Sequence, residues 1–266
     1  MPRYDSLLLN CGGGIINRSQ QSKQYRGAAA LAIGIGGTGV AALAELKQKG
    51  YQHLEPDNPD SPVPEYQHIQ FLAIDSDPTD IAMMRGMARL DREREFFYIN
   101  NPNLPATLRK KDLIKSNASL NWMDIDRIGD LMLLGNLPVC PIRQVGRYLL
   151  ISRASNLIST IQAKCTQALE GMTGSELDVY IFAGLSGGTG GGCFLDTCYI
   201  VQKALEDMGR AQSANVMGFF FLPDVVNSKP QVASQPATVK YYSSNGYAAM
   251  KELDYLMSLK DADDWF

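Results

Sequence analysis

Two glycine-rich segments carry the residue types best suited to chemistry in this chain. Gly34–Gly39 holds four glycines and a threonine, and Ala183–Gly192 holds six glycines, Ser186 and Thr189. Each follows an apolar run and precedes apolar residues at helical spacing, so we expect both between a buried strand and a helix N-terminus. Free backbone N–H groups and the positive end of the helix dipole bind phosphate there, and glycine allows close approach. The segments predict a polyphosphate cradle, with the two hydroxyl groups as further donors at its rim.

A third polar segment, Asp75-Ser76-Asp77-Pro78, follows another apolar run. A carboxylate in this position orients Mg²⁺ through water, because magnesium usually keeps several waters and few protein carboxylates. We expect Asp77 to take this role. The alternative for both Asp75 and Asp77 is an N-cap of the helix that begins near Thr79, because aspartate oxygens accept hydrogen bonds from the first N–H groups of helices.

Strands that alternate with helices must position these segments. We expect strands at 28–33, 69–74, 95–99, 177–182 and 216–222. Helices are expected at 40–49, 107–115, 123–134, 144–169 and 242–259. Two more are expected, one that begins near residue 79 and one that follows the second glycine segment and ends near residue 208. The strands are nearly continuous apolar runs, which is typical of a parallel sheet covered on both faces. The pattern predicts a three-layer α/β fold with a doubly wound, mostly parallel sheet. Ligand-binding loops in such folds lie at the carboxyl ends of the strands.

Other stretches are expected to be structural. Residues 56–64 and 227–237 are predicted loops because they are rich in proline and polar residues. The Phe219-Phe220-Phe221 run is predicted to be a buried core strand rather than a base-stacking surface.

Composition excludes several classes of protein. The net charge is -3 and 20% of residues are charged, so there is no electrostatic case for nucleic acid, and Arg109-Lys110-Lys111 is expected to be a solvated helix face. Five cysteines form no C-x-x-C pair and there are two histidines, which argues against a zinc site. No apolar run is long enough to span a membrane and no signal peptide is recognisable, so we expect a cytoplasmic protein without membrane partners.

One alternative is a dinucleotide-binding domain. Gly34-x-Gly36-x-x-Gly39 is a formal match to the fingerprint of NAD- or FAD-binding Rossmann domains, with Asp75 as a candidate for the ribose. This interpretation leaves the second glycine segment without a role. A Walker A loop is excluded because no glycine is followed by Lys-Ser or Lys-Thr.

The order of the motifs resembles that of the tubulin/FtsZ family of GTPases. The similar segments, from first to last, are Ile33–Gly39, Ala73–Asp77, Pro141–Arg147, Ser186–Gly192, Phe221–Pro223 and Asn245–Ala249. Ser186–Gly192 looks like the family's G-G-G-T-G-[ST]-G signature, and the last segment resembles a tubulin helix whose asparagine contacts guanine. The resemblance implies a protein that binds GTP or GDP with Mg²⁺.

The resemblance also implies roles for individual residues. Gly187–Gly191 would hold the α- and β-phosphates, and Gly36, Gly37 and Thr38 would contact the β/γ end. Arg143 or Arg147 would face phosphate, unless it is a solvent-facing helix arginine. Asn245 would contact guanine, unless it is the N-cap of the last helix. The full set of nucleotide-binding candidates is Gly36, Gly37, Thr38, Asp75, Asp77, Arg143, Ser186, Gly187, Gly188, Thr189, Gly190, Gly191 and Asn245, with Asp77 at the metal.

The same resemblance implies a mode of action and a domain plan. Residues 1–27 are expected to be an irregular lead-in and 28–266 the GTP-binding domain, with the family's central helix and C-terminal domain absent. Subunits would assemble head to tail, and a neighbouring subunit would complete GTP hydrolysis, so no catalytic residue is assigned. Departures at Leu137–Cys140 and after Pro223 leave a further alternative, an interaction protein with a vestigial nucleotide pocket.

Overall fold

The computed structural model describes residues 29–51, 68–84, 89–101, 104–128, 142–170, 172 and 176–258. The expected lead-in, the loop at 56–64 and the Leu137–Cys140 segment lie outside these residues. The strands are β1 (Ala29–Ile35), β2 (Ile69–Asp75), β3 (Phe96–Tyr98), β4 (Leu177–Gly184) and β5 (Ala214–Phe221). The helices are α2 (Gly36–Tyr51), α3 (Thr79–Met83), α4 (Leu104–Leu108), α5 (Lys111–Ser116), α7 (Arg143–Ile151), α8 (Ala154–Leu169), α9 (Gly188–Asp207), α10 (Asp224–Asn227), α11 (Pro230–Ala233) and α12 (Pro236–Ser258).

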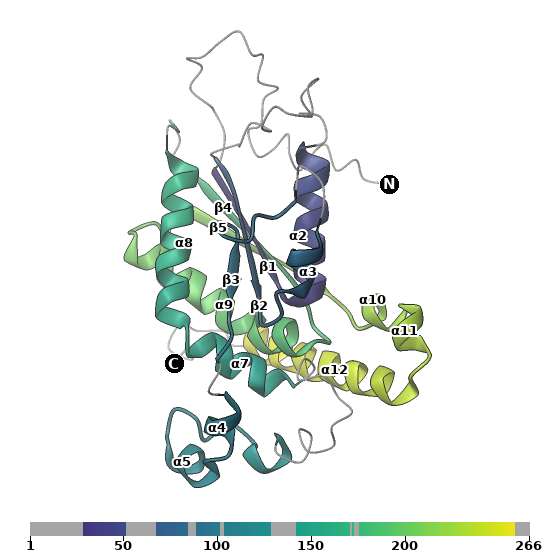
Figure 1. The fold of residues 1–266 in the computed structure, drawn as a ribbon. Coiled ribbons are helices and arrows are strands. Elements are labelled where there is room, and N and C mark those ends of the chain that lie inside the picture. The colour runs from purple at the N-terminus through teal and green to yellow at the C-terminus, as the bar shows by residue number, and fades with distance from the viewer. Residues whose placement is uncertain are drawn as a thin grey trace.

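The five strands form one parallel sheet in the order β3-β2-β1-β4-β5 (Figure 1). Every residue of β1 is buried, as its unbroken apolar sequence predicts for a central strand. From β1 the chain passes to β2 on one side, and from β4 to β5 on the other. The strand order therefore reverses between β1 and β4, the point in doubly wound sheets where ligands bind.

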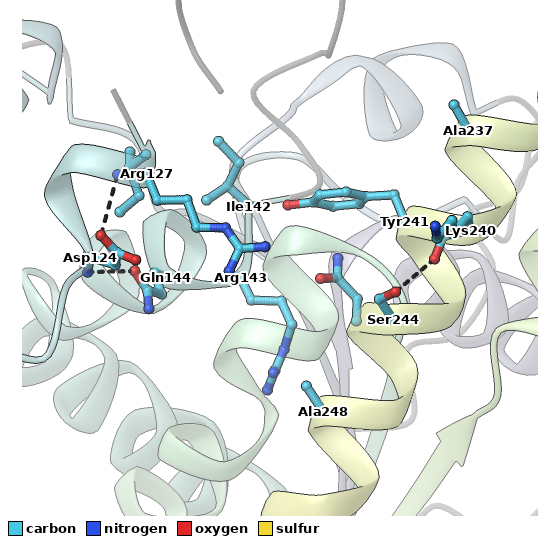
Figure 2. A pocket seen from close by; sticks show the side chains of 12 residues that line it. Asp124, Arg127, Ile142, Arg143, Gln144, Ala237, Lys240, Tyr241, Ser244 and Ala248 are labelled. Atoms are coloured by element: carbon cyan, nitrogen blue, oxygen red, sulfur yellow. Dashed lines mark hydrogen bonds between the residues drawn. The ribbon is translucent and has the colours of Figure 1, made fainter. Parts of the chain in front are cut away.

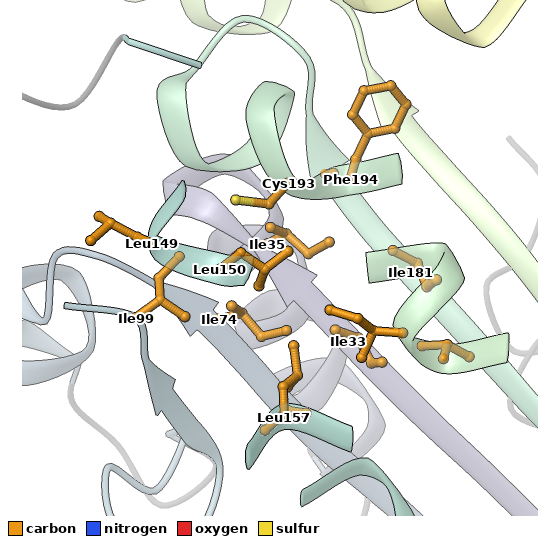
Figure 3. Close-up of a cluster of buried hydrophobic side chains, with 14 of the residues drawn as sticks. Ile33, Ile35, Ile74, Ile99, Leu149, Leu150, Leu157, Ile181, Cys193 and Phe194 are labelled. Carbon is orange, nitrogen blue, oxygen red and sulfur yellow. The ribbon is translucent and has the colours of Figure 1, made fainter. Parts of the chain in front are cut away.

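Helices cover both faces of the sheet, so the predicted three-layer α/β architecture is confirmed. On one face α2 packs over β1, β2 and β4 around a small core that includes Leu43 and Phe71. On the other face α7, α8 and α9 enclose the larger core, part of which is drawn in Figure 3. No helix in the described part of the chain is long and apolar enough to cross a membrane.

The predicted helix at 144–169 is two helices, and this expectation was wrong. α7 and α8 are separated at Ser152 and Arg153, where the Ser152 hydroxyl donates to the Leu149 carbonyl at 2.8 Å and Arg153 leaves helical geometry. The break lets α7 pack against α9 while α8 crosses the sheet. Both helices turn an apolar stripe toward the same core, so the period of apolar residues alone does not reveal the break between them.

Smaller differences concern short helices. The predicted helix at 107–115 is replaced by α4 and α5, and the predicted loop at 227–237 contains α11 and the start of α12, directly after α10. Each of α4, α5, α10 and α11 is one or two turns long, below the length at which an apolar period identifies a helix.

Both glycine segments are more helical than expected. α2 begins at Gly36 and α9 at Gly188, so most of the glycines form the first turns of these helices rather than loops before them. The backbone N–H groups of a first helical turn have no partner within the helix. This places unpaired donors where the sequence predicts a phosphate site.

The strand β5 is not a core strand. Phe219 is 39% exposed, although its ring stacks on Phe182 at 5.1 Å between centroids. Only Phe220 turns toward the main core, where it meets the ring edge of Phe194. β5 pairs with β4 alone among the described strands, and burial at the edge of a sheet is lower than its apolar sequence suggests.

Candidate functional site

Two helix N-termini meet at the carboxyl edge of the sheet. α2 follows β1 and α9 follows β4, and these strands are neighbours. Gly36 has a φ of +68°, which favours glycine, and a Cβ atom there would lie 2.7 Å from the backbone nitrogen of Gly190. The first turns of both helices are therefore in backbone contact. Their positive dipole ends converge at the point where the strand order reverses. We call Gly36–Thr38 together with Gly187–Gly191 the glycine cradle.

The glycines of the α9 turn have two different roles. Cβ atoms at Gly190, Gly191 and Gly192 would collide with the carbonyl groups of Gly184, Leu185 and Arg143. These glycines are therefore required by the packing of the protein itself.

Gly187 differs from them, because a Cβ there would meet no atom within 4 Å. Its φ of -80° and ψ of 166° suit any residue. The absence of a side chain at Gly187 leaves open space directly before the first turn of α9.

The helix α7 closes one side of the cradle. A Cβ at Gly146 would collide with the Gly188 carbonyl, so α7 lies directly against the first turn of α9. On the other side Gly184 allows Thr38 to approach, since a Cβ at Gly184 would lie 2.7 Å from the Thr38 Cβ. Glycine spacing thus brings β4, α2, α7 and α9 together at one point.

A cavity of about 320 Å³ opens over the cradle between the ends of β2 and β3 and the first turn of α9. Its polar lining includes Ser76, Asp77, Asn100 and Thr189. The hydroxyl groups of Ser76 and Thr189 are hydrogen bonded at 3.1 Å, so the Asp-Ser-Asp segment and the glycine signature are in direct contact. Sequence analysis expects both at one site, and the structure brings them together.

The two aspartates have different surroundings. Asp75 is buried and accepts a hydrogen bond from the backbone N–H of Ser76 at 2.7 Å. Asp77 lines the cavity, and its Oδ1 accepts from both the hydroxyl and the backbone N–H of Thr79, which begins α3. These bonds hold the pKa of the Asp77 carboxyl below its usual value, so the group is ionised at neutral pH. Asp77 is not the N-cap of α3, which is Pro78, but its bonds hold Thr79, the first residue of that helix.

The bonds to Thr79 do not remove Asp77 from the metal hypothesis. No group of three metal-ligating side chains occurs in the described part of the chain. Magnesium bound with a nucleotide needs few protein carboxylates, since phosphates and waters complete its shell. One ionised carboxylate at a cavity beside Gly188 and Thr189 fits that donor set.

Asn245 is not the N-cap of the last helix, because it lies inside α12. Its Nδ2 donates to the carbonyl of Ser186 at 2.9 Å, which ties α12 to the start of the cradle. Ser186 is fully buried, and its Oγ has no hydrogen-bond partner among the described residues. The structure therefore places this hydroxyl beneath the cradle surface, not at the rim where we expected it.

Neither arginine of α7 is a solvent-facing helix residue. Arg143 donates from Nε to the Gly191 carbonyl at 2.9 Å, and its guanidinium makes a two-pronged ion pair with Glu252 of α12. Arg147 pairs with Asp196 at 2.8 Å and lies over the Trp122 ring. In this structure Arg143 acts as a brace that joins α7, the cradle and α12.

A second cavity, of about 460 Å³, lies beside the cradle along α12, and we call it the α12 pocket (Figure 2). Its lining comes from three separate parts of the chain: Asp124, Arg127, Ile128, Ile142, Arg143, Gln144, Ala237, Lys240, Tyr241, Ser244, Asn245 and Ala248. Figure 2 shows the Arg127 side chain extending into the cavity toward Tyr241. Sequence analysis missed Arg127, Lys240 and Tyr241, since no local motif marks them and only the fold places them together.

Comparison with known proteins bears on the same region. A family model described as "Tubulin like" matches residues 31–264, which include the cradle, both cavities and all of β1 except its first two residues. A search among curated proteins found no match.

Proposed function

Because this chain belongs to the tubulin-like family, we propose that it binds a guanine nucleotide with its phosphates in the glycine cradle. The base would lie beside α12, where Asn245 contacts the start of the cradle. Gly187, Gly188 and Thr189 would hold the α- and β-phosphates, and Gly36, Gly37 and Thr38 would lie toward the terminal phosphate.

The convergence of the α2 and α9 N-termini carries this proposal. Each helix is 16 residues or longer, so each contributes a full dipole and a first turn of unpaired N–H groups. A polyphosphate places several negative charges at one point and matches two such ends better than a single anion does. Open space at Gly187 leaves room for the phosphate to reach the backbone.

The contact between Gly36 and the backbone of Gly190 argues against the dinucleotide alternative. In a Rossmann domain the second glycine of the fingerprint is bare so that the pyrophosphate can approach it. Here the position corresponds to Gly36, and the backbone of Gly190 already occupies the space beside it. The lack of a side chain at Gly36 is thus explained by the approach of α9.

We propose that Mg²⁺ accompanies the nucleotide, with Asp77 acting through water. The ion would supply positive charge to the terminal phosphates. Asp77 itself contributes an ionised carboxylate, and the Ser76–Thr189 hydroxyl pair lies on the same wall of the cavity.

Assembly follows as a proposal from family membership. Head-to-tail contact would place a neighbouring subunit over the cradle and complete hydrolysis of GTP, since phosphoryl transfer requires mainly positioning and charge stabilisation. Phosphate release per chain should then increase with protein concentration over a hundredfold range. A rate that is rapid and independent of concentration would instead place the complete catalytic apparatus within one chain.

Titration with GTP, ATP and NAD tests the binding proposal, using wild type and Gly187→Val. Wild type should bind GTP more tightly than ATP or NAD. Valine suits the extended backbone of Gly187 and its Cβ meets no protein atom, so the variant should still fold, with a melting temperature close to that of wild type, yet bind GTP at least about tenfold more weakly.

Two results would count against the proposal. Tighter binding of NAD than of GTP would favour the Rossmann alternative. An unchanged melting temperature with GTP and Mg²⁺ in large excess over any useful affinity would favour a vestigial pocket, because a bound ligand must stabilise the folded chain.

A further inference from the structure

The α12 pocket contains two positive charges for which the described part of the chain offers no partner. Among the described residues, the side chains of Arg127 and Lys240 have no hydrogen-bond or ion-pair partner. The third cation of the lining, Arg143, is held by Glu252 and Gly191. The pocket therefore presents two cationic side chains without partners among the described residues, next to the proposed phosphate site.

Arg127 is held in place by its neighbours in the chain. It lies in a short turn that is anchored by Ile125 and Ile128, both of which are buried in the main core. The Asp124 carboxylate accepts from the Arg127 backbone N–H at 3.3 Å and so caps this turn. The backbone is fixed by buried residues while the guanidinium is exposed to the cavity, which is the arrangement expected of a recognition side chain.

The Arg127 charge acts on the aromatic ring across the cavity. Burial raises the pKa of Tyr241, while the positive charges of Arg127 and Arg143 lower it. This agrees with the view in Figure 2, where Arg127 extends toward Tyr241. A planar ligand in the cavity would therefore meet an aromatic ring and a guanidinium fork together.

Asn245 uses one of its amide N–H groups for a contact within the protein. Its amide nitrogen donates to the Ser186 carbonyl, which fixes the spacing between α12 and the cradle. We therefore treat Asn245 as a positioning residue that acts in the same way on GTP and ATP.

The two purines differ at the edge that an arginine reads. Guanine presents two acceptors, O6 and N7, whereas adenine presents an acceptor at N7 and a donor at N6. An arginine fork carries donors only and pairs with guanine at both positions. We infer, resting on the proposed function, that Arg127 selects guanine by donating to O6 and N7, with Tyr241 against the face of the base.

The test combines protein variants with modified nucleotides. Arg127→Met keeps an unbranched apolar stem and removes the guanidinium donors, and 7-deaza-GTP lacks the N7 acceptor. Wild type should bind GTP about tenfold or more tightly than either ATP or 7-deaza-GTP. Arg127→Met should lose about tenfold in GTP affinity, keep its ATP affinity within about twofold, and no longer distinguish GTP from 7-deaza-GTP.

Two further variants serve as controls. Arg109→Met removes an exposed positive charge outside the pocket lining and should leave all three affinities unchanged. Asn245→Ala should weaken GTP and ATP by the same factor, because it alters spacing and not base recognition.

The possible failures are distinguishable. If wild type binds no nucleotide, the proposed function and this inference fall together. If wild type prefers GTP but Arg127→Met keeps that preference, or weakens GTP and ATP equally, the proposed function stands and the role of Arg127 is overturned. Loss of the preference in Asn245→Ala alone would make Asn245 the reader of the base.

Discussion

The glycine cradle and the α12 pocket lie side by side but are built by opposite means. The cradle is made of backbone from two strand–helix junctions, and its glycines at Gly36, Gly190 and Gly191 are required because neighbouring main chains lie in contact. The α12 pocket is made of side chains from three segments that are distant in sequence. A backbone site binds any phosphate, while a side-chain site distinguishes the group attached to it. The comparison suggests that affinity depends mainly on the cradle and selectivity mainly on the pocket.

The largest expected effect comes from adding the same side chain at two points of the cradle. In Gly190→Val the new Cβ would collide with the Gly184 carbonyl, and the backbone must move. We expect a loss of about 3 kcal/mol or more in the free energy of unfolding, near the upper end of overpacking effects. Gly187→Val, its matched control, should lose about 1 kcal/mol or less, because the new Cβ meets no atom and the cost is only that of a poorer N-cap for α9.

Urea denaturation of both glycine variants without nucleotide provides the measurement. Equal stability of the two would mean that the α9 turn can relax around a side chain. The distinction between packing glycines and an open glycine would then be incorrect.

An intermediate effect is expected where the two regions are joined. Glu252→Gln removes the carboxylate that braces Arg143, whose side chain is 14% exposed, against α12. Because Glu252 is itself 48% exposed, solvent screens part of the interaction, and we expect a loss of about 1 kcal/mol. Glu45→Gln breaks the more exposed pair with Lys49 on α2 and should lose less than about 0.5 kcal/mol.

Thermal melts of these two glutamine variants compare an internal brace with a surface ion pair. If both lose the same amount, the Arg143–Glu252 pair is an ordinary surface contact. The cradle and the α12 pocket would then be independent of each other.

The smallest effect concerns Asp77 at the edge of the cradle. Hydrogen bonds from Thr79 lower the pKa of Asp77 in the folded chain, so the ionised group stabilises the fold above the unfolded pKa of about 4. That contribution is lost as the pH falls through the lower, folded pKa. Asp77→Asn should cost about 0.5 kcal/mol at neutral pH, because the amide oxygen of asparagine can still accept the hydrogen bonds from Thr79.

The difference between wild type and Asp77→Asn should shrink as the pH is lowered below about 4. Urea midpoints at several pH values measure it. A difference that grows in acid would mean that the Asp77 carboxyl favours its protonated form in the fold, contrary to the bonds from Thr79.

Residues of the cradle were accessible to sequence analysis because the signal is local. Apolar runs locate the strands, and glycines after them locate the helix N-termini, as at Gly34–Gly39 and Gly187–Gly192. The pocket was inaccessible for the converse reason. Arg127 and Tyr241 are far apart in the chain, and nothing in their own surroundings distinguishes them from ordinary surface residues.

Two other differences have physical causes that a periodic pattern does not record. The break at Ser152 leaves the apolar stripe intact on both sides, so α7 and α8 look like one helix. The sequence of β5 is as apolar as that of a central strand, but burial depends on how many strands lie beside it. Position in the sheet is a property of the whole fold.

The edge strand β5 has a consequence for the behaviour of the protein in solution. Its eight residues, Ala214–Phe221, include no charged side chain and no proline, and Val216, Met217 and Phe219 are each close to 40% exposed. An uncharged edge of this kind, whose outer side pairs with no other strand of the described residues, is a template on which another polypeptide can form a strand. Purified chains that expose this edge should aggregate by extending the sheet. Salt should offer little protection, since no charge lies along the strand, whereas a lysine at Val216 should keep the chains apart.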